Sequence, residues 1–344
     1  MDVRQNVPLA PLTTLGIGGP ARYYVRATTV DEIREAVAWA QERDVALFVL
    51  GGGSNLLIAD DGFDGLVLHV DLRGITVESE DEHPMVKVAA GEPWDPFVAF
   101  AVERSWAGIE CLSGIPGSTG ATPIQNVGAY GQEVAETIAR VEALDRTSGL
   151  VRTFTNWDCR FGYRMSLFKN HEPGRWVVLN VTYRLTRGGA ATVRYPELQK
   201  FLEGVPLTDL RLVREAVIAI RKRKGMVIDP NDPDTRSDGS FFMNPVLSAE
   251  DYARFAAVAP EAPHFPAGSE VKLSAAWLIE HAGFHKGFVH GNVGLSTKHT
   301  LAVINRGGGT AREVLELVGM IQGKVRETFG VEIHPEPNFI GFGS

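Results

Sequence analysis

Two glycine-rich segments of the chain carry the residues best suited to binding an anion. Gly51-Gly52-Gly53-Ser54-Asn55 follows an apolar run, and it can turn consecutive backbone N–H groups toward one point, with Ser54 and Asn55 as side-chain donors. A tight turn between two strands is the alternative for this segment alone. The second segment, 115–131, consists mainly of small residues that let a backbone lie against a flat ligand. Together the two segments fit a long ligand with a diphosphate in its middle.

A third candidate segment surrounds one serine. Residues 239–245 place Ser240 between a glycine and two phenylalanines, which outlines a dry pocket; a buried structural serine is the alternative. Upstream, residues 221–224 are four consecutive cations at the end of a predicted helix, where positive charge complements the helix dipole. We expect the first three to be solvated and Lys224, which borders the next loop, to contact a ligand.

Several other motif matches and the overall composition exclude whole classes of function. Residues 16–21 fit the dinucleotide-binding fingerprint only superficially, because no strand precedes them. Glycines interrupt the helix that would align His281 with His285, so we expect no metal site. Lys plus Arg number 34 against 42 Asp plus Glu, and the net charge of −8 disfavours nucleic acid and anionic membranes as partners.

The location follows from what the 344 residues lack. No stretch approaches the ~18 apolar residues that cross a bilayer, and the N-terminal residues do not resemble a signal peptide. We therefore expect a cytoplasmic protein. Its two cysteines, Cys111 and Cys159, are expected to serve packing.

The elements that must position these segments alternate between strands and helices. Strands are predicted at 23–27, 46–50, 86–90, 141–144 and 177–185, and helices at 95–104, 208–224 and 274–281. Capping boxes at Thr29–Glu32 and Thr310–Glu313 predict two further helix starts. Residues 113–131 show no period, and a stretch that long without structure is usually functional. The turn-rich residues 229–234 mark the best boundary to a C-terminal unit.

Taken in order along the chain, these segments resemble the UDP-N-acetylenolpyruvoylglucosamine reductase family of flavoenzymes. The resemblance runs from residues 14–19 through 51–55, 115–131, 161–166 and 239–245 to 335–341. It implies an α+β fold with a two-part FAD-binding region of the vanillyl-alcohol-oxidase type and a C-terminal α/β substrate-binding domain. The implied bounds are 1–70, 71–224 and 225–344. Tyr195 lies where type I members carry a tyrosine loop, which assigns the chain to type I.

The resemblance also implies the activity, the cofactors and the residues that serve them. The implied reaction is NADPH-dependent reduction of the enolpyruvyl group of UDP-N-acetylglucosamine enolpyruvate to UDP-N-acetylmuramate, in the synthesis of peptidoglycan. FAD is expected without a covalent bond, because Ser54 stands where covalent relatives have histidine. The implied catalytic residues are Ser240, the proton donor, with Arg164 and Glu336. The implied cofactor-binding residues are Gly51, Gly52, Gly53, Ser54, Asn55, Gly117, Ser118, Thr119, Gly120, Thr122, Gln125, Asn126, Gly128, Ala129 and Tyr130. The implied substrate contacts are Tyr163, Tyr195, Lys224, Asn244 and His299.

Two other functions remain open from the sequence. A flavin oxidase of the same fold acting on an alcohol or sugar would consume oxygen without NADPH, but residues 239–242 and Glu336 argue against it. A non-catalytic flavoprotein that binds a nucleotide sugar would not need Ser240, Arg164 and Glu336, and all three are present. We expect a monomer whose partners are small molecules.

Overall fold

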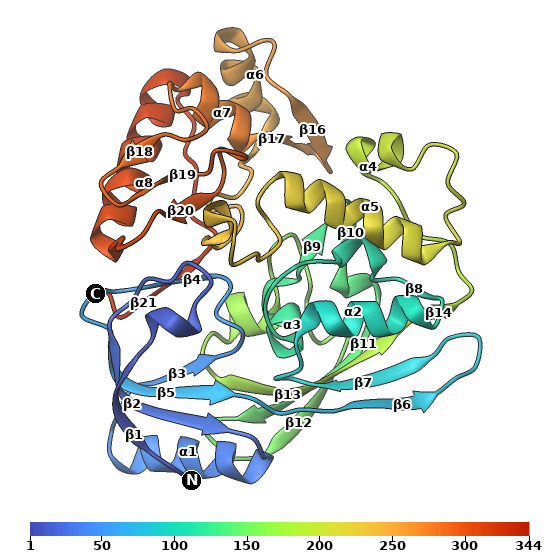
Figure 1. Ribbon diagram of the computed structural model, residues 1–344, viewed down its shortest axis with the longest axis vertical. Helices are drawn as coiled ribbons and strands as arrows, with labels where there is room; N and C mark the ends of the chain where they lie inside the picture. The colour runs from blue at the N-terminus through green and yellow to red at the C-terminus, as the bar shows by residue number, and fades with distance from the viewer. Residues whose placement is uncertain (344) are drawn as a thin grey trace. The chain divides into compact units, whose positions relative to one another are not determined.

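The computed structural model describes residues 1–343, which form two compact units. Unit 1 comprises residues 1–7, 21–53 and 64–222, and unit 2 comprises 8–20, 54–63 and the chain from residue 223 onward. Each unit contains both helices and strands (Figure 1). The division passes through the first glycine-rich segment, so that Gly51–Gly53 belong to unit 1 while Ser54 and Asn55 belong to unit 2.

The N-terminal part of unit 1 is a four-stranded sheet with a helix beside it (Figure 1). The strand order is β1 (Arg4–Pro8), β2 (Pro20–Ala27), β5 (Phe63–Val70), β3 (Leu47–Leu50), with β3 parallel to β5. Helix α1 (Val30–Glu42) begins at the predicted capping box, in which Thr29 and Glu32 bond each other's backbone. Its Ile33, Val37 and Ala40 are buried, so the predicted apolar face is confirmed.

The larger sheet of unit 1 is antiparallel throughout. Its order is β12 (Val151–Thr155), β11 (Ile138–Asp145), β13 (Trp176–Arg184), β7 (Met85–Ala89), β6 (Ile75–Ser79). The valines of the three inner strands, β11, β13 and β7, are buried because β-branched side chains pack well on a pleated surface. The helices of this part are α2 (Trp94–Glu103), α3 (Thr122–Gln125), α4 (Pro196–Phe201) and α5 (Leu210–Arg223). The short strand pairs are β8 (Trp106–Ala107) with β14 (Thr186–Arg187), and β9 (Gly128–Ala129) with β10 (Gln132–Glu133).

Unit 2 has its own core, built around its longest helix. Helix α8 (Ala311–Phe329) starts at the predicted Thr310–Glu313 capping box and buries Val314, Leu317, Val318, Ile321 and Val325. The other helices are α6 (Ala249–Val258) and α7 (Ala275–His281). Three small sheets complete the unit: β15 (Val246–Leu247), β17 (Glu270–Leu273), β16 (His264–Ala267); β18 (Val289–His290), β19 (Val293–Leu295), β20 (Val303–Asn305); and β21 (Asn338–Ile340) parallel to β4 (Leu56–Ile58).

Three sequence-based expectations meet different outcomes in this fold. Cys111 and Cys159 are buried and unbridged, which confirms their packing role. The segment 113–131 is more ordered than expected, because a 3₁₀ turn at Thr119–Ala121 leads directly into the one-turn helix α3. No helix within residues 1–343 is both long and apolar enough to cross a membrane.

Candidate functional site

In unit 1 the two glycine-rich segments approach each other at main-chain distance. A Cβ atom placed on Gly52 would lie 2.5 Å from the Gly117 Cα and 2.8 Å from the Ser118 nitrogen. A Cβ on Gly51 would lie 2.5 Å from the Ser118 Oγ. Glycine is therefore required at position 52 because a side chain there would overlap the backbone of the second segment.

The second glycine-rich segment is held in place by backbone hydrogen bonds to the start of α2. Trp94 N–H donates to the Gly117 carbonyl (3.0 Å), Thr119 N–H to the Glu92 carbonyl (2.8 Å) and Gly120 N–H to the Ala90 carbonyl (2.8 Å). In the part of the chain that the structure describes, the N–H groups of Gly52 and Gly117 have no protein acceptor. Two such donors on closely approaching loops are available to bind phosphate oxygens.

The two threonines of this segment differ in their partners. Thr122 Oγ1 donates to the Thr119 carbonyl (2.8 Å) and lies 2.6 Å from the Tyr183 hydroxyl. Thr119 Oγ1 is buried with no hydrogen-bond partner among residues 1–343. A buried hydroxyl without a partner is uncommon in a folded protein, and it is consistent with a polar group supplied by a ligand.

Asn126 joins the glycine-rich segment to the loop that presents Arg164. Asn126 ends α3 in the left-handed conformation, with φ of +46°, and its side chain is buried. Its Nδ2 donates to the Gly162 carbonyl (2.9 Å) and to Glu133 Oε2 (2.8 Å), and its Oδ1 accepts from Ala135 N–H (3.2 Å). These bonds give the predicted cofactor residue Asn126 an internal positioning role.

Arg164 stands in a tight turn within unit 1. Gly162 and Met165 exchange two backbone hydrogen bonds of 3.1 Å around it, and Arg164 itself has φ of +55°. Its guanidinium donates to the Gly128 carbonyl (3.0 Å) and the Asn126 carbonyl (3.4 Å). A non-glycine residue held in this region costs of order 1–3 kcal/mol, which the surrounding hydrogen bonds offset. The guanidinium is therefore fixed beside the second glycine-rich segment.

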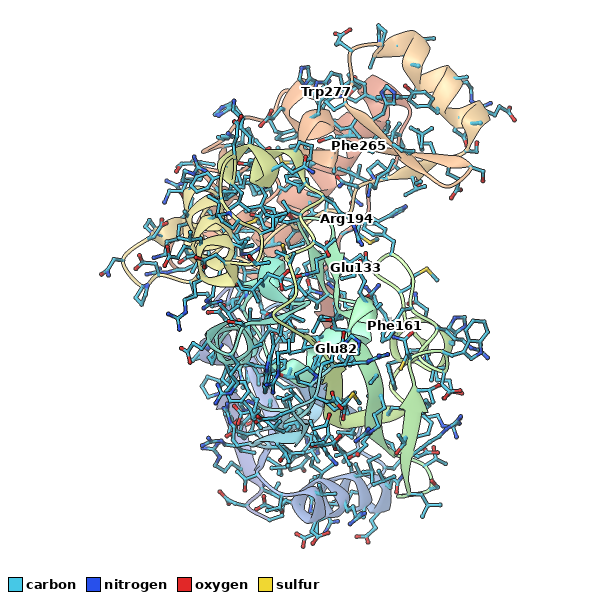
Figure 2. All side chains as sticks on the ribbon, turned by 90° about the vertical axis from the view of Figure 1, so that its right-hand side faces the viewer. Glu82, Glu133, Phe161, Arg194, Phe265 and Trp277 are labelled. Carbon is cyan, nitrogen blue, oxygen red and sulfur yellow. The ribbon has the colours of Figure 1, made fainter. Side chains whose placement is uncertain are left out.

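The predicted tyrosine loop is held against the same segment. Arg194, labelled just above Glu133 in Figure 2, donates to the Gly131 carbonyl (2.8 Å) and pairs with Glu136. The rings of Tyr195 and Tyr130 meet edge to face, with centroids 5.6 Å apart. Unit 1 thus brings Tyr195, Tyr130 and the Gly128 region into one neighbourhood.

One cation in the run 221–224, Arg221, is buried, although we expected it to be solvated. Arg221 is buried in α5, where it donates a hydrogen bond to the Tyr130 hydroxyl, and burial lowers the pKa of its guanidinium. Burial also raises the pKa of Tyr130 to about 12, so its hydroxyl stays neutral at physiological pH. The signal was present in the sequence, because Arg221 lies four residues after the buried Val217 on one helix face. Lys222 and Arg223 are exposed, as expected.

In unit 2 the serine segment runs antiparallel to the segment that carries Glu336. Glu336 N–H donates to the Phe241 carbonyl (2.8 Å), and Phe242 forms an antiparallel bridge with Pro335. In this register Glu336 lies opposite Phe241, and Ser240 lies one residue further along, opposite Pro337. Ser240 is half-buried, while Phe241 and Phe242 are fully buried in the core of unit 2.

Asn55 connects the first glycine-rich segment to this pair. Its Nδ2 donates to the Glu336 carbonyl (3.3 Å), and its own carbonyl accepts from Asn338 N–H (3.0 Å). The parallel pairing of β4 with β21 continues this contact. Unit 2 therefore brings together the segments that carry Asn55, Ser240 and Glu336, although these residues span almost 300 positions of the sequence.

The remaining predicted substrate residues lie in two settings. In unit 2, Asn244 Oδ1 accepts from Ala275 N–H (3.0 Å) at the start of α7, and the backbone carbonyl of His299 accepts from Ala302 N–H (3.1 Å). Lys224 follows α5 and is half-buried, also in unit 2. Tyr163 belongs to unit 1 and is exposed next to Arg164. Of the three predicted catalytic residues, Ser240 and Glu336 are in unit 2 and Arg164 is in unit 1.

Sequence reasoning missed one buried acid, Asp238. It lies two residues before Ser240, and its Oδ1 accepts from the Thr14 hydroxyl (3.1 Å). Burial raises the pKa of Asp238 to about 7, although hydrogen bonds from Thr14 and from the Leu56 backbone N–H act in the opposite direction. No periodic pattern marks this position, so only the fold reveals that it is buried.

The residues of unit 1 fit a bound FAD. The space between Gly52 and Gly117 is so narrow that a single Cβ atom on Gly52 would fill it. The Thr119 hydroxyl has no hydrogen-bond partner in the described part of the chain. Both features are expected of loops that close around a diphosphate and its neighbouring groups.

Comparison with known proteins supports this interpretation. Residues 21–155 match the family model of an FAD binding domain. Residues 230–340 match the model described as the C-terminal domain of UDP-N-acetylenolpyruvoylglucosamine reductase. The predicted α+β fold class, an FAD-binding region followed by a separate C-terminal domain, is thereby confirmed.

Full-length relatives extend the match to nearly every residue. A UDP-N-acetylenolpyruvoylglucosamine reductase from Thermobifida fusca is 47% identical over 98% of this chain and 98% of that protein. One from Cutibacterium acnes is 49% identical over 98% of this chain and 90% of that protein. The crystal structure of the enzyme of this name from Thermus caldophilus superposes with a TM-score of 0.69 at 25% identity, covering 98% of this chain and 100% of that chain.

Proposed function

The chain belongs to the UDP-N-acetylenolpyruvoylglucosamine reductase family, and on this premise we propose that Ser240, Arg164 and Glu336 are its catalytic residues. The enzyme reduces the enolpyruvyl group of UDP-N-acetylglucosamine enolpyruvate to give UDP-N-acetylmuramate, a precursor of peptidoglycan, with NADPH as reductant and FAD as cofactor. The observation that supports the residue assignment is the antiparallel pairing of the segment that carries Ser240 with the segment that carries Glu336, which Asn55 also contacts.

When bound, FAD supplies a centre that accepts hydride from NADPH and donates it to the terminal carbon of the enolpyruvyl group. We propose that it is held by Gly51–Asn55 and by a second set of residues in 117–130. The second set is Gly117, Ser118, Thr119, Gly120, Thr122, Gln125, Asn126, Gly128, Ala129 and Tyr130. The amides of Gly52 and Gly117 and the hydroxyl of Thr119 support this assignment most directly. We propose that FAD is bound without a covalent bond, because Ser54 stands at the position where covalent relatives have histidine.

Arg164 stabilises the negative charge that develops on the substrate. Addition of hydride to the methylene carbon leaves charge on the neighbouring carbon and its carboxylate, and a guanidinium can pair two oxygens at once. Its fixed position in a hydrogen-bonded turn means that little reorganisation is needed when the charge appears. Removing one such prearranged donor typically costs about 3–4 kcal/mol of transition-state stabilisation. Glu336 shares a proton with the same carboxylate.

Ser240 completes the reduction by donating its hydroxyl proton to the charged carbon. A hydroxyl is a weak acid toward water, but carbon bearing this charge is strongly basic, and a positioned proton donor is commonly worth ~10²–10⁴-fold. The two residues that follow the serine, Phe241 and Phe242, are fully buried. Tyr163, Tyr195, Lys224, Asn244 and His299 are proposed to bind the nucleotide sugar or NADPH.

The deciding experiment measures NADPH consumption by the purified, FAD-loaded chain with and without the enolpyruvyl nucleotide sugar. We expect consumption to require the sugar and the product to gain two hydrogens by mass spectrometry. The variant Ser248→Ala, which alters a helix cap elsewhere in unit 2, serves as the matched control and should retain full activity. Oxygen consumption with an alcohol or sugar in the absence of NADPH would instead indicate the oxidase that the sequence left open.

We further propose that the chain acts as a monomer in the cytoplasm, where nucleotide sugars and NADPH are available. The domain bounds 1–70, 71–224 and 225–344 are likewise proposed. The start of the C-terminal stretch of unit 2 at residue 223 supports the last of these bounds.

A further inference from the structure

A buried acid of unit 2 connects the proposed FAD loop to the proposed proton donor. We propose that Asp238 is a positioning residue whose protonation is coupled to FAD binding, so that the chain takes up a proton when it takes up the cofactor. The proposal rests on the assignment of Gly51–Asn55 to the FAD diphosphate. It adds a residue and a proton to that function, and nothing in the family comparison assigns either.

The contacts of Asp238 tie three segments together. Its Oδ1 accepts from the Thr14 hydroxyl (3.1 Å), and the backbone N–H of Leu56, the first residue after Asn55, also acts on the carboxyl group. Asp238 also directly precedes the Gly239–Ser240 turn. Any change in the charge of this carboxyl therefore acts on the end of the glycine-rich loop and on the backbone that carries Ser240.

The second carboxyl oxygen has no compensating partner. Asp238 Oδ2 is buried and accepts no hydrogen bond from any group in residues 1–343, and the whole residue is only 8% exposed. An ionised carboxylate with one oxygen in this state is costly, whereas a protonated carboxyl is tolerated much better. This agrees with the pKa of about 7 that burial imposes on the group.

No charged neighbour stabilises the ionised form of the Asp238 carboxyl. Residues 8–20, which carry Thr14, and residues 51–59, which carry Leu56, contain no charged side chain. The segment joined to Asn55 carries Glu336, and the strand bridged to Ser237 leads to Arg306. On its own segment Asp238 has the exposed Arg236 and has Asp234, which bonds Thr297. None of these charges contributes to the shift, which burial dominates.

FAD binding would act on this acid through its diphosphate. A dianionic group held by Ser54 and Asn55, the residues directly before Leu56, would be a like charge close to Asp238, and it would disfavour the ionised carboxylate further. Coupling between two binding events is reciprocal, so a proton on Asp238 must strengthen FAD binding by the same factor by which FAD strengthens proton binding. Each unit of added pKa shift corresponds to a tenfold change in the FAD dissociation constant.

The test measures FAD affinity of the full chain by flavin fluorescence between pH 6 and pH 8.5. Wild type should bind about tenfold more weakly at pH 8.5 than at pH 6, which is the effect of a one-unit shift. Asp238→Asn, which keeps the shape without the charge, should show less than about a twofold change over the same range. Asp229→Asn, an exposed acid of the same stretch, is the matched control and should retain the wild-type pH dependence. Calorimetry in two buffers of different ionisation enthalpy should show proton uptake by wild type that Asp238→Asn lacks.

A second variant keeps the proposal testable if Asp238→Asn does not fold. Thr14→Val removes a hydroxyl that favours the ionised form, so the midpoint of the pH dependence should move upward. Any one of three results would overturn this inference without affecting the proposed function. These results are equal FAD affinity of wild type at both pH values, an unchanged pH dependence in Asp238→Asn, and an unmoved midpoint in Thr14→Val. Failure of every variant and of wild type to bind FAD at any pH would instead refute the proposed function.

Discussion

The close approach of Gly52 to the second glycine-rich segment makes Gly52→Ala the sharpest test of the cofactor site. The new Cβ would lie 2.5 Å from Gly117 Cα, 2.7 Å from the Gly117 carbonyl carbon and 2.8 Å from the Ser118 nitrogen. Ordinary contact begins at 3.4 Å, so the two loops would have to separate by about 0.9 Å. Every one of these neighbours is a main-chain atom, and none can rotate away.

The second segment cannot yield without breaking its own hydrogen bonds. Its carbonyl at Gly117 and its amides at Thr119 and Gly120 are bonded to residues 90–94 at 2.8 to 3.0 Å. Overpacking of this kind typically costs about 1–3 kcal/mol. If this free-energy cost destabilises the FAD-bound state relative to the free protein, the FAD dissociation constant rises by roughly five- to 150-fold, because 1.4 kcal/mol corresponds to a tenfold change.

The matched control changes the adjacent glycine. A Cβ on Gly51 meets only the Ser118 Oγ closely, at 2.5 Å, and its next neighbour lies at 3.8 Å. That hydroxyl can rotate away, so Gly51→Ala should change FAD affinity by no more than about threefold, an energy below ~1 kcal/mol. Fluorescence titration with FAD and thermal unfolding would be measured on both variants. If Gly52→Ala binds FAD as tightly as Gly51→Ala, the two segments do not form the cofactor cradle.

Three further predictions concern residues at and beneath the proposed site. Ser240→Ala should still lose flavin absorbance when NADPH is added, but turnover with the enolpyruvyl substrate should fall ~10²–10⁴-fold in stopped-flow assays; normal turnover would exclude the serine as proton donor. Asn126→Ala should lower the free energy of unfolding by about 2–4 kcal/mol in urea titrations, because hydrogen bonds to Gly162, Glu133 and Ala135 are lost at a buried residue; a loss below ~0.5 kcal/mol would contradict this. Burial raises the pKa of Asp238 from 3.8 to about 7 in the folded state. Between these two pH values the native protein therefore binds more protons than the unfolded chain, so the stability of wild type should fall as the pH rises from 4 to 7. Asp238→Asn should remove this fall, giving a gain over wild type that grows by up to about 4 kcal/mol across that range, whereas parallel stability curves would refute the assignment.

Local signals predicted most of the secondary structure that supports the site. Both capping boxes open helices, because a threonine hydroxyl and a glutamate three residues later satisfy backbone donors whatever the rest of the fold does. The strand runs 86–90, 141–144 and 177–185 correspond to β7, β11 and β13 with small shifts at the ends. These features depend on neighbours within a few residues, which a single sequence contains in full.

The fit of the glycine-rich segments required the structure. Composition indicated that 51–55 and 115–131 could bind an anion, but small residues are equally compatible with turns. The distinction comes from Gly52 and Gly117 lying at backbone contact, a relation between residues 65 positions apart. Nothing in either segment specifies its partner, so the resemblance to a family supplied that assignment before the structure did.

Arg221 and Asp238 show two different limits of sequence reasoning. The helical period places Arg221 on the same face as the buried Val217, which predicts that Arg221 is buried. The interpretation of residues 221–224 gave more weight to their positive charge and predicted that Arg221 is solvated. For Asp238 no period exists, because it lies in an irregular stretch between a 3₁₀ turn and a two-residue strand. Its hydrogen-bond donors, Thr14 and Leu56, come from the far N-terminal part of the chain. A charged residue in a loop is normally solvated. Burying an acid without a neighbouring cation lowers the stability of the folded state at and above neutral pH, where the acid would be ionised. Such a cost is expected to persist where the same proton also serves binding. The fall in stability should therefore end near pH 7, where the fall in FAD affinity begins, and both pH dependences should be lost together in Asp238→Asn.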